Sequence, residues 1–292
     1  MDYLVRAIDK DAQVRIFACN SKNMVETARN IHNTSKTATA ALGRTLTAAA
    51  LMSENLKNEA DTLTLNIKGD GGIGQIVVTA KANGVVKGYV NNPMADCEIR
   101  ESDGKLDVGR IVGNGTLTVV ADQGLKEPYI GKVELISGEI AEDLANYFYR
   151  SDQVPSVVSL GVLVDVDYTV RAAGGFILQL MPGADDECIS KIEENISKLK
   201  AITTMLDEGL TPEQIIEHVM DGFEIKFLDK KEIGFNCDCS REKVEDSLIS
   251  IGKDELKAII EEDGKAEVTC HFCNEKYSFN EEELENILNS IE

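Results

Sequence analysis

Two cysteine pairs govern how the end of this chain can fold: Cys237-Asp238-Cys239 and, after 30 intervening residues, Cys270-His271-Phe272-Cys273. Four thiolates brought together in this way suit a tetrahedral Zn²⁺ ion, with Zn–S bonds of about 2.3 Å. The second pair has the spacing of a zinc knuckle, whereas the first pair is tighter than usual. Four sulfur ligands leave no open coordination position. We therefore predict a structural zinc ion bound by Cys237, Cys239, Cys270 and Cys273.

Residues 231–292, which contain these cysteines, are predicted to form a C-terminal zinc-binding domain. A domain of about 60 residues usually needs a metal or disulfides, because its hydrophobic core is too small to keep it folded alone. A four-cysteine zinc site supplies about 10–16 kcal/mol of apparent binding free energy, most of it coupled to folding. We therefore expect the fold of residues 231–292 to depend on the metal.

The preceding residues, 183–230, are predicted to form a helical middle region. Met181-Pro182-Gly183 ends the strand pattern before it, and apolar residues then recur at helical spacing from Cys188 to Leu199. Thr211-Pro212 opens a further helix, with Thr as N-cap and Pro in the first turn. Because the region has few aromatic residues and buries only a modest core, it is expected to depend on its neighbours for stability.

Residues 1–182 have the pattern of one α+β domain with mainly antiparallel sheets. Alternation in Tyr3–Ile8 and Gln13–Cys19 indicates a β-hairpin. Helices are expected over Met24–His32, Ser35–Leu56 and Glu139–Arg150, and further strands over Leu63–Lys68, Gln75–Ala82, Val85–Val90, Thr116–Ala121, Gly131–Ile136, Val157–Val166 and Gly175–Leu180. Many short strands with few intervening helices favour antiparallel over parallel sheets.

The charge and the apolar content of the chain argue against some classes of function. Its 30 Lys and Arg stand against 51 Asp and Glu, which gives a formal net charge of −21. Phosphate backbones repel such a polyanion, so nucleic-acid binding is not expected. The N-terminus has no signal-peptide pattern, and the most apolar helical stretch, Ala38–Met52, is too short to span a bilayer. We predict a cytoplasmic protein without membrane association, whose thiols are kept reduced.

The sequence does not predict catalysis, and the protein is not expected to be an enzyme. Residues 69–74 satisfy the pattern G-x-G-x-x-G, but a β-type stretch follows where a dinucleotide-binding fold requires a helix. A hairpin loop is expected there instead. His271 is expected to be a spectator beside the zinc ligands, and Cys19, Cys97 and Cys188 are expected to be small buried apolar residues.

The residues alone leave two uses of the cysteine cluster open. The commoner use is an inert structural zinc site. The other is a redox sensor, because oxidants attack thiolates and disulfides among the ligands would expel the zinc. A Cys237–Cys239 bond would need a bent backbone, since two extended residues span about 6.6–7.2 Å and a disulfide tolerates about 4.4–6.8 Å between Cα atoms. Strained disulfides are readily reduced again, which suits a switch.

A Cys-x-Cys pair with a distant Cys-x-x-Cys near the C-terminus strongly resembles the heat-shock protein 33 family of redox-regulated, ATP-independent bacterial chaperones. The resemblance covers essentially the whole chain. It includes Gly74-Gln75-Ile76-Val77, Val86-Lys87-Gly88-Tyr89-Val90-Asn91 and the stretch from Tyr149 to Ser156. In the last stretch the family more often has Glu where this chain has Asp152, a difference without consequence for the expected chemistry.

The resemblance implies a holdase, a chaperone that binds unfolding client proteins without catalytic turnover. Its reduced form, with one zinc ion per chain, would be inactive. Oxidation would form the Cys237–Cys239 and Cys270–Cys273 disulfides, release zinc, unfold the C-terminal domain and destabilise the middle region. The family's oxidised form is also described as a homodimer. The alternative is a constitutive structural-zinc protein, either a binding module or an enzyme with an unidentified site, that has no redox switch.

Overall fold

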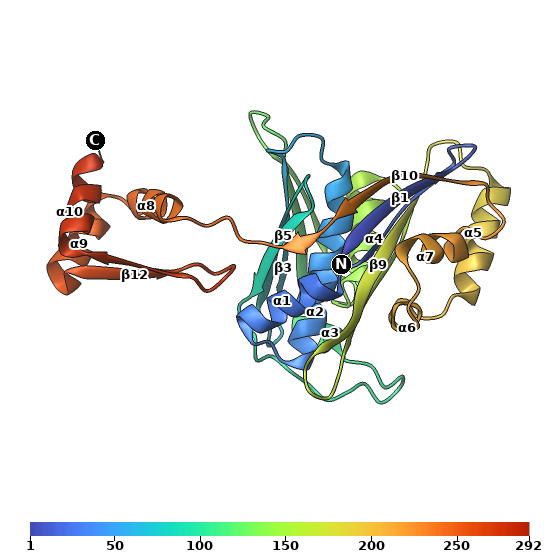
Figure 1. Cartoon of the computed structure of the whole chain (residues 1–292), viewed down its shortest axis with the longest axis horizontal. Coiled ribbons are helices and arrows are strands. Elements are labelled where there is room, and N and C mark those ends of the chain that lie inside the picture. The colour runs from blue at the N-terminus through green and yellow to red at the C-terminus, as the bar shows by residue number, and fades with distance from the viewer. Residues whose placement is uncertain (292) are drawn as a thin grey trace. The chain divides into compact units, whose positions relative to one another are not determined.

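The computed structural model describes residues 1–291 and separates them into two units (Figure 1). The N-terminal unit comprises Met1–Asn236, and the C-terminal unit begins at Cys237. Each unit has a hydrophobic core of its own. The predicted α+β class with mainly antiparallel sheets is confirmed.

The first sheet of the N-terminal unit pairs the first strand of that unit with a strand close to its end. Its antiparallel strands lie in the order β10 (Ile225–Glu232), β1 (Tyr3–Asp9), β2 (Val14–Asn20), β9 (Val170–Leu180) and β8 (Ser156–Val164). The predicted hairpin is present as β1 and β2. On its other edge, β1 pairs with β10 along its whole length.

The second sheet contains most of the remaining predicted strands. Its order is β11 (Gly234–Phe235), β5 (Val85–Val90), β4 (Gln75–Lys81), β3 (Thr62–Gly69), β6 (Gly115–Asp122) and β7 (Tyr129–Glu134). Residues 70–74 form the hairpin loop between β3 and β4, as predicted. Gly69 cannot carry a side chain, because a Cβ there would lie 1.9 Å from the carbonyl oxygen of Val112 in the short helix α3 (Val108–Val112).

Helix α2 (Lys36–Met52) lies inside the N-terminal unit and packs against strands of both sheets. All its residues except Lys36 and Arg44 are buried, which agrees with its composition of Ala, Leu and Thr. Helix α1 (Lys22–His32) precedes it, and a 3₁₀ turn over Ser53–Asn55 follows it. Within residues 1–291, no helix is long and apolar enough to cross a membrane.

Three helices of the predicted middle region cover one face of the first sheet: α5 (Asp186–Lys198), α6 (Ile202–Asp207) and α7 (Pro212–Val219). Their buried residues form one apolar cluster with residues of β1, β2 and β9. Thr211 caps α7, since its hydroxyl accepts the Gln214 N–H at 3.3 Å. These helices therefore keep an apolar sheet face away from water.

The expected helical character of residues 183–230 is wrong at the end of that region. Helix α7 ends at Val219, and Ile225–Glu232 is strand β10, so the expected boundary at residue 231 lies inside a strand. The physical reason is the free edge of β1, which supplies backbone partners for a segment with little apolar patterning of its own. The division into 1–182, 183–230 and 231–292 as separate folding regions stays a prediction.

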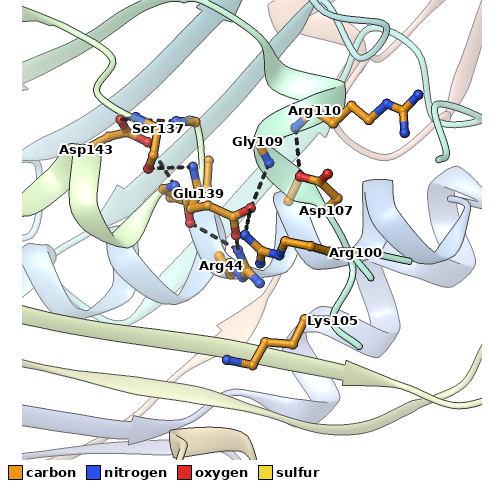
Figure 2. Close-up of polar contacts among 12 residues, drawn as sticks. Arg44, Arg100, Lys105, Asp107, Gly109, Arg110, Ser137, Glu139 and Asp143 are labelled. Carbon is orange, nitrogen blue, oxygen red and sulfur yellow. Dashed lines mark hydrogen bonds and ion pairs between the residues drawn. The ribbon is translucent and has the colours of Figure 1, made fainter. Parts of the chain in front are cut away.

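A largely buried ion pair joins α2 to the loop before helix α4 (Ala141–Tyr147). Arg44 Nη1 donates to the Glu139 carboxylate at 2.6 Å, and the two side chains are only 12% and 17% exposed. The same carboxylate accepts the Gly109 N–H at 3.0 Å and lies 3.5 Å from the Arg100 guanidinium. Figure 2 shows both guanidinium groups directed at Glu139. One carboxylate thus holds α2, α3 and this loop together.

The carboxylate of Asp143 fixes the loop that carries Glu139. It accepts the backbone N–H groups of Ile136 at 2.7 Å, Ser137 at 3.1 Å and Ile140 at 2.9 Å (Figure 2). Ile140 has φ 74°, a left-handed conformation that is rare for a β-branched residue. Asp143 is fully buried, so these bonds hold the strained loop in place without competition from water.

The C-terminal unit is small and is built around one apolar cluster. It contains α8 (Arg241–Ser250), α9 (Lys253–Asp263), β12 (Lys265–Thr269), β13 (Lys276–Asn280) and α10 (Glu281–Ser290). The buried residues of the cluster are Val244, Leu248, Leu256, Phe279, Leu284 and Ile287. Phe235 lies within the predicted zinc domain but packs against the N-terminal core. A core this small agrees with the expectation that the unit needs a further source of stability.

Candidate metal centre

The structure brings the four predicted cysteines together in the C-terminal unit. Cys237 and Cys239 lie on the extended segment before α8, and Cys270 and Cys273 lie in the turn between β12 and β13. The Sγ atoms of Cys237 and Cys270 are 3.7 Å apart, and those of Cys239 and Cys273 are 3.3 Å apart. All four sulfur atoms lie within 4.8 Å of one another.

This spacing fits a tetrahedral zinc ion. With Zn–S bonds of about 2.3 Å, the edge of a regular ZnS₄ tetrahedron measures about 3.8 Å. The four side chains are half-buried, so they can be loaded with metal and remain open to attack by small oxidants. His271 is exposed and does not belong to the group of possible ligands found among residues 1–291; its role as a spectator stays a prediction.

A tight turn presents Cys270 and Cys273. The Asn274 N–H donates to the Cys270 carbonyl at 2.8 Å, and the Cys270 N–H donates to the Glu275 carbonyl at 2.8 Å. Asn274 has φ 60°, a left-handed conformation that Asn tolerates better than most residues. This turn closes the β12–β13 hairpin and places two sulfur ligands at its tip.

Charged side chains hold the Cys237–Cys239 segment in place. Lys243 Nζ donates to the Asp238 carbonyl at 2.7 Å and lies 2.9 Å from the Asp238 carboxylate. Arg241 binds the Glu283 carboxylate at 2.7 Å and lies 4.3 Å from the centre of the Phe279 ring. These contacts therefore hold the start of α8 against β13 and α10. The first cysteine pair, just before α8, is thereby placed beside the second pair.

The thiols differ in how readily they lose a proton. The Tyr277 hydroxyl donates a hydrogen bond to Cys239 Sγ at 3.2 Å, and this bond lowers the pKa of the Cys239 thiol. Burial raises the pKa of Cys237 and of Cys273, although backbone N–H groups partly oppose this effect. Cys239 is thus the member of the cluster whose thiolate the protein stabilises through a neighbouring side chain.

Replacing Tyr277 with Phe is expected to weaken Zn²⁺ binding by about 10- to 100-fold, because the ring is kept while the donor to the Cys239 thiolate is lost. Competition with a chromogenic chelator measures the affinity. Tyr149→Phe, at an exposed tyrosine of the N-terminal unit, is the control and should bind zinc like the unmodified protein. Equal affinities of the two variants would contradict the role of this hydrogen bond.

The other three cysteines lie in the N-terminal unit, away from any cluster of possible metal ligands among residues 1–291. Cys19 and Cys188 are buried, as expected, and burial raises the pKa of both thiols. Cys97 is half-buried and donates to the Asp107 carbonyl at 3.3 Å, so it is less enclosed than expected. Their raised pKa values disfavour the thiolate and make these cysteines less reactive than an ordinary exposed thiol.

Comparison with known proteins gives one consistent result. A family model described as "Hsp33 protein" matches residues 2–280. The chain is 53% identical to the "33 kDa chaperonin" of Clostridioides difficile, with 99% of each chain covered, and 49% identical to that of Bacillus subtilis, with 98% of each covered.

A solved structure extends the comparison to the fold. The crystal structure of the 33 kDa chaperonin (heat shock protein 33 homolog) from Thermotoga maritima matches with a TM-score of 0.90 and 41% identity. The match covers 98% of this chain and 97% of that one. With a matching family model, relatives that match over nearly their whole length and a solved structure with the same fold, the chain belongs to the Hsp33 family of chaperones.

Proposed function

We propose that this protein is a redox-regulated holdase of the cytoplasm. In the reduced state Cys237, Cys239, Cys270 and Cys273 hold one Zn²⁺ ion, and the protein is inactive. Oxidation releases the zinc, and the protein then binds unfolding client proteins and keeps them from aggregating. It acts without catalytic turnover, and neither nucleic acid nor a membrane is a partner.

The observation that carries the proposal is the convergence of four half-buried sulfur atoms in a unit with a small core. A zinc ion there would link the segment before α8 to the β12–β13 turn, which are 30 residues apart in the chain. Loss of the ion would remove this link and with it most of the stability of the C-terminal unit. Zinc binding and folding would therefore be lost together.

The proposed disulfides are Cys237–Cys239 and Cys270–Cys273, as the family resemblance implies. Each forms when two thiolates give two electrons to an oxidant such as hydrogen peroxide, which is reduced to water. The four ligands are then consumed in pairs, and zinc cannot return until a thiol reductant acts.

The client-binding surface is proposed to become accessible when the middle helices loosen. Helices α5, α6 and α7 bury residues such as Ile192, Met205 and Ile216 against the first sheet, so their release would uncover an extended apolar face. Large exposed apolar faces are sites where other proteins associate. The same exposure would support formation of a homodimer by the oxidised protein.

The test is to treat the reduced, zinc-loaded protein with hydrogen peroxide at heat-shock temperature. We expect zinc release, measured with a chromogenic chelator, to rise in step with suppression of light scattering by a thermally unfolding client. Size-exclusion chromatography of the same samples should show a dimer. If the oxidised protein releases zinc but leaves client aggregation unchanged, the constitutive structural-zinc alternative is correct.

A further inference from the structure

Strand β11 occupies the outer edge of β5 in the N-terminal unit. The two strands run parallel, with Gly234 opposite Val85 and Phe235 opposite Val86. The Gly234 N–H donates to the Gly84 carbonyl at 3.1 Å, and the Asn236 N–H donates to the Val86 carbonyl at 3.0 Å. The chain thus covers this part of the sheet edge with a short segment of itself.

The next carbonyl along this edge has a different partner. His32 Nε2 lies 2.9 Å from the Gly88 carbonyl oxygen, and because a carbonyl can only accept, the ring nitrogen donates. Removal of β11 would leave the carbonyls of Gly84 and Val86 without these donors, while the bond from His32 could remain. The edge would then offer two acceptors at strand spacing to a new extended segment.

Two apolar side chains anchor the segment. Ile233 is 7% exposed, and Phe235 packs against the same core with its ring centre 6.4 Å from that of His32. Gly234, between them, has open space where a side chain would lie. The site therefore accepts a large apolar residue, any residue, and a second large apolar residue in extended conformation.

We infer that the outer edge of β5, here called the edge slot (the backbone of Gly84–Gly88 with His32), binds extended client segments that have two large apolar side chains two residues apart. In the closed protein, Ile233–Asn236 occupies the edge slot as an internal competitor. The inference rests on the proposed function, because oxidation must release this segment before a client can enter.

The edge slot selects clients by strand geometry. In an extended segment residues i and i+2 point to the same side, so both apolar side chains can enter the core while the backbone pairs with β5. An apolar pair at i and i+3 would point to opposite sides. Segments with apolar residues at alternate positions are those that sheets expose as they unfold, and recognition by main-chain pairing tolerates many sequences.

The internal segment explains why the slot would be closed in the reduced protein. A tethered competitor acts at a high effective concentration, in the millimolar range for short linkers, which free clients do not reach. Cys237 follows Phe235 by two residues, so the competitor is joined directly to the segment that carries the first two zinc ligands. Unfolding of that segment would remove the restraint on one end of β11.

The test measures binding of a fluorescent peptide with the sequence of residues 231–236, Lys-Glu-Ile-Gly-Phe-Asn, to the full-length protein. One control peptide has Ser at both apolar positions, and another has a second Gly inserted between Ile and Phe. We expect the oxidised protein to bind the first peptide at least about tenfold more tightly than either control. The reduced protein should bind none of the three measurably.

A matched pair of variants tests the internal competitor. Phe235→Ser should allow the reduced protein to bind the first peptide, whereas Phe227→Ser, on β10 and 41% exposed, should not. If the oxidised protein binds all three peptides equally, or if the two variants behave alike, the inference is overturned. Client aggregation is measured on the same oxidised samples, so an active holdase without peptide selectivity separates failure of the edge slot from failure of the proposed function.

Discussion

Replacing Cys270 with Ser is expected to unfold the C-terminal unit of the reduced protein and leave the N-terminal unit folded. Serine offers no sulfur ligand, so the site falls from four ligands to three. The zinc contribution of about 10–16 kcal/mol is comparable with or larger than the whole stability of an ordinary domain, about 5–15 kcal/mol. The buried cluster around Leu256 and Phe279 is too small to replace it.

Zinc content and amide hydrogen exchange measure the effect. We expect zinc to fall from one ion per chain to none, and exchange in α8, α9 and α10 to become fast while α2 stays protected. Cys97→Ser, at a half-buried cysteine of the N-terminal unit, is the control and should keep both the metal and the protection. Slow exchange in α8–α10 of a zinc-free Cys270→Ser protein would contradict the dependence of this unit on the metal.

Replacing Glu139 with Gln is expected to destabilise the N-terminal unit by about 3–5 kcal/mol. Gln keeps the shape of the side chain but leaves the largely buried Arg44 guanidinium without its counter-charge. Arg44 Nε already has no partner among the described residues, and the bond from Nη1 to the Glu139 carbonyl oxygen at 3.1 Å is to a neutral acceptor, so it cannot replace the lost counter-charge. The shift of the urea midpoint for the N-terminal unit, followed by hydrogen exchange of α2, measures the change.

Glu134→Gln is the control, because Glu134 lies at the exposed end of β7 and makes no buried ion pair with the residues described. Its stability should stay within about 0.5 kcal/mol of the unmodified protein. A Glu139→Gln protein with the same midpoint as this control would show that the buried ion pair does not stabilise the fold.

The fold could be predicted where local pattern and tertiary environment agree. The β1–β2 hairpin, the β3–β4 hairpin loop and helix α2 follow from alternation, glycine and apolar composition. Strand β9 was expected from Gly175 but begins at Val170. Its first part, rich in Ala and Gly, has little strand propensity and is held by β2 and β8 on either side, where a Cβ at Gly174 would lie 2.4 Å from the Cys19 carbonyl oxygen.

The sequence predicts the four cysteines of the candidate site, but it does not predict the side chains that surround them. The spacing of the four cysteines is itself a chemical signal, and the structure brings these cysteines together. Tyr277 and Arg241 have no comparable signal, because each acts on a segment more than 30 residues away in the chain. Only the packing of β13 beside the start of α8 places the hydroxyl near Cys239.

The pairing of β1 with β10 has a consequence for synthesis of the chain. Arg6 and Asp229, which face each other across this pair, are separated by 223 residues, so β1 leaves the ribosome long before its partner is made. Contacts between residues so far apart in the chain form slowly. Because the chain is synthesised from its N-terminus, the first sheet cannot be completed until β10 has been made. A nascent chain that stops before residue 225 would therefore present the bare edge of β1, and this chaperone would itself be prone to aggregate until β10 has been synthesised.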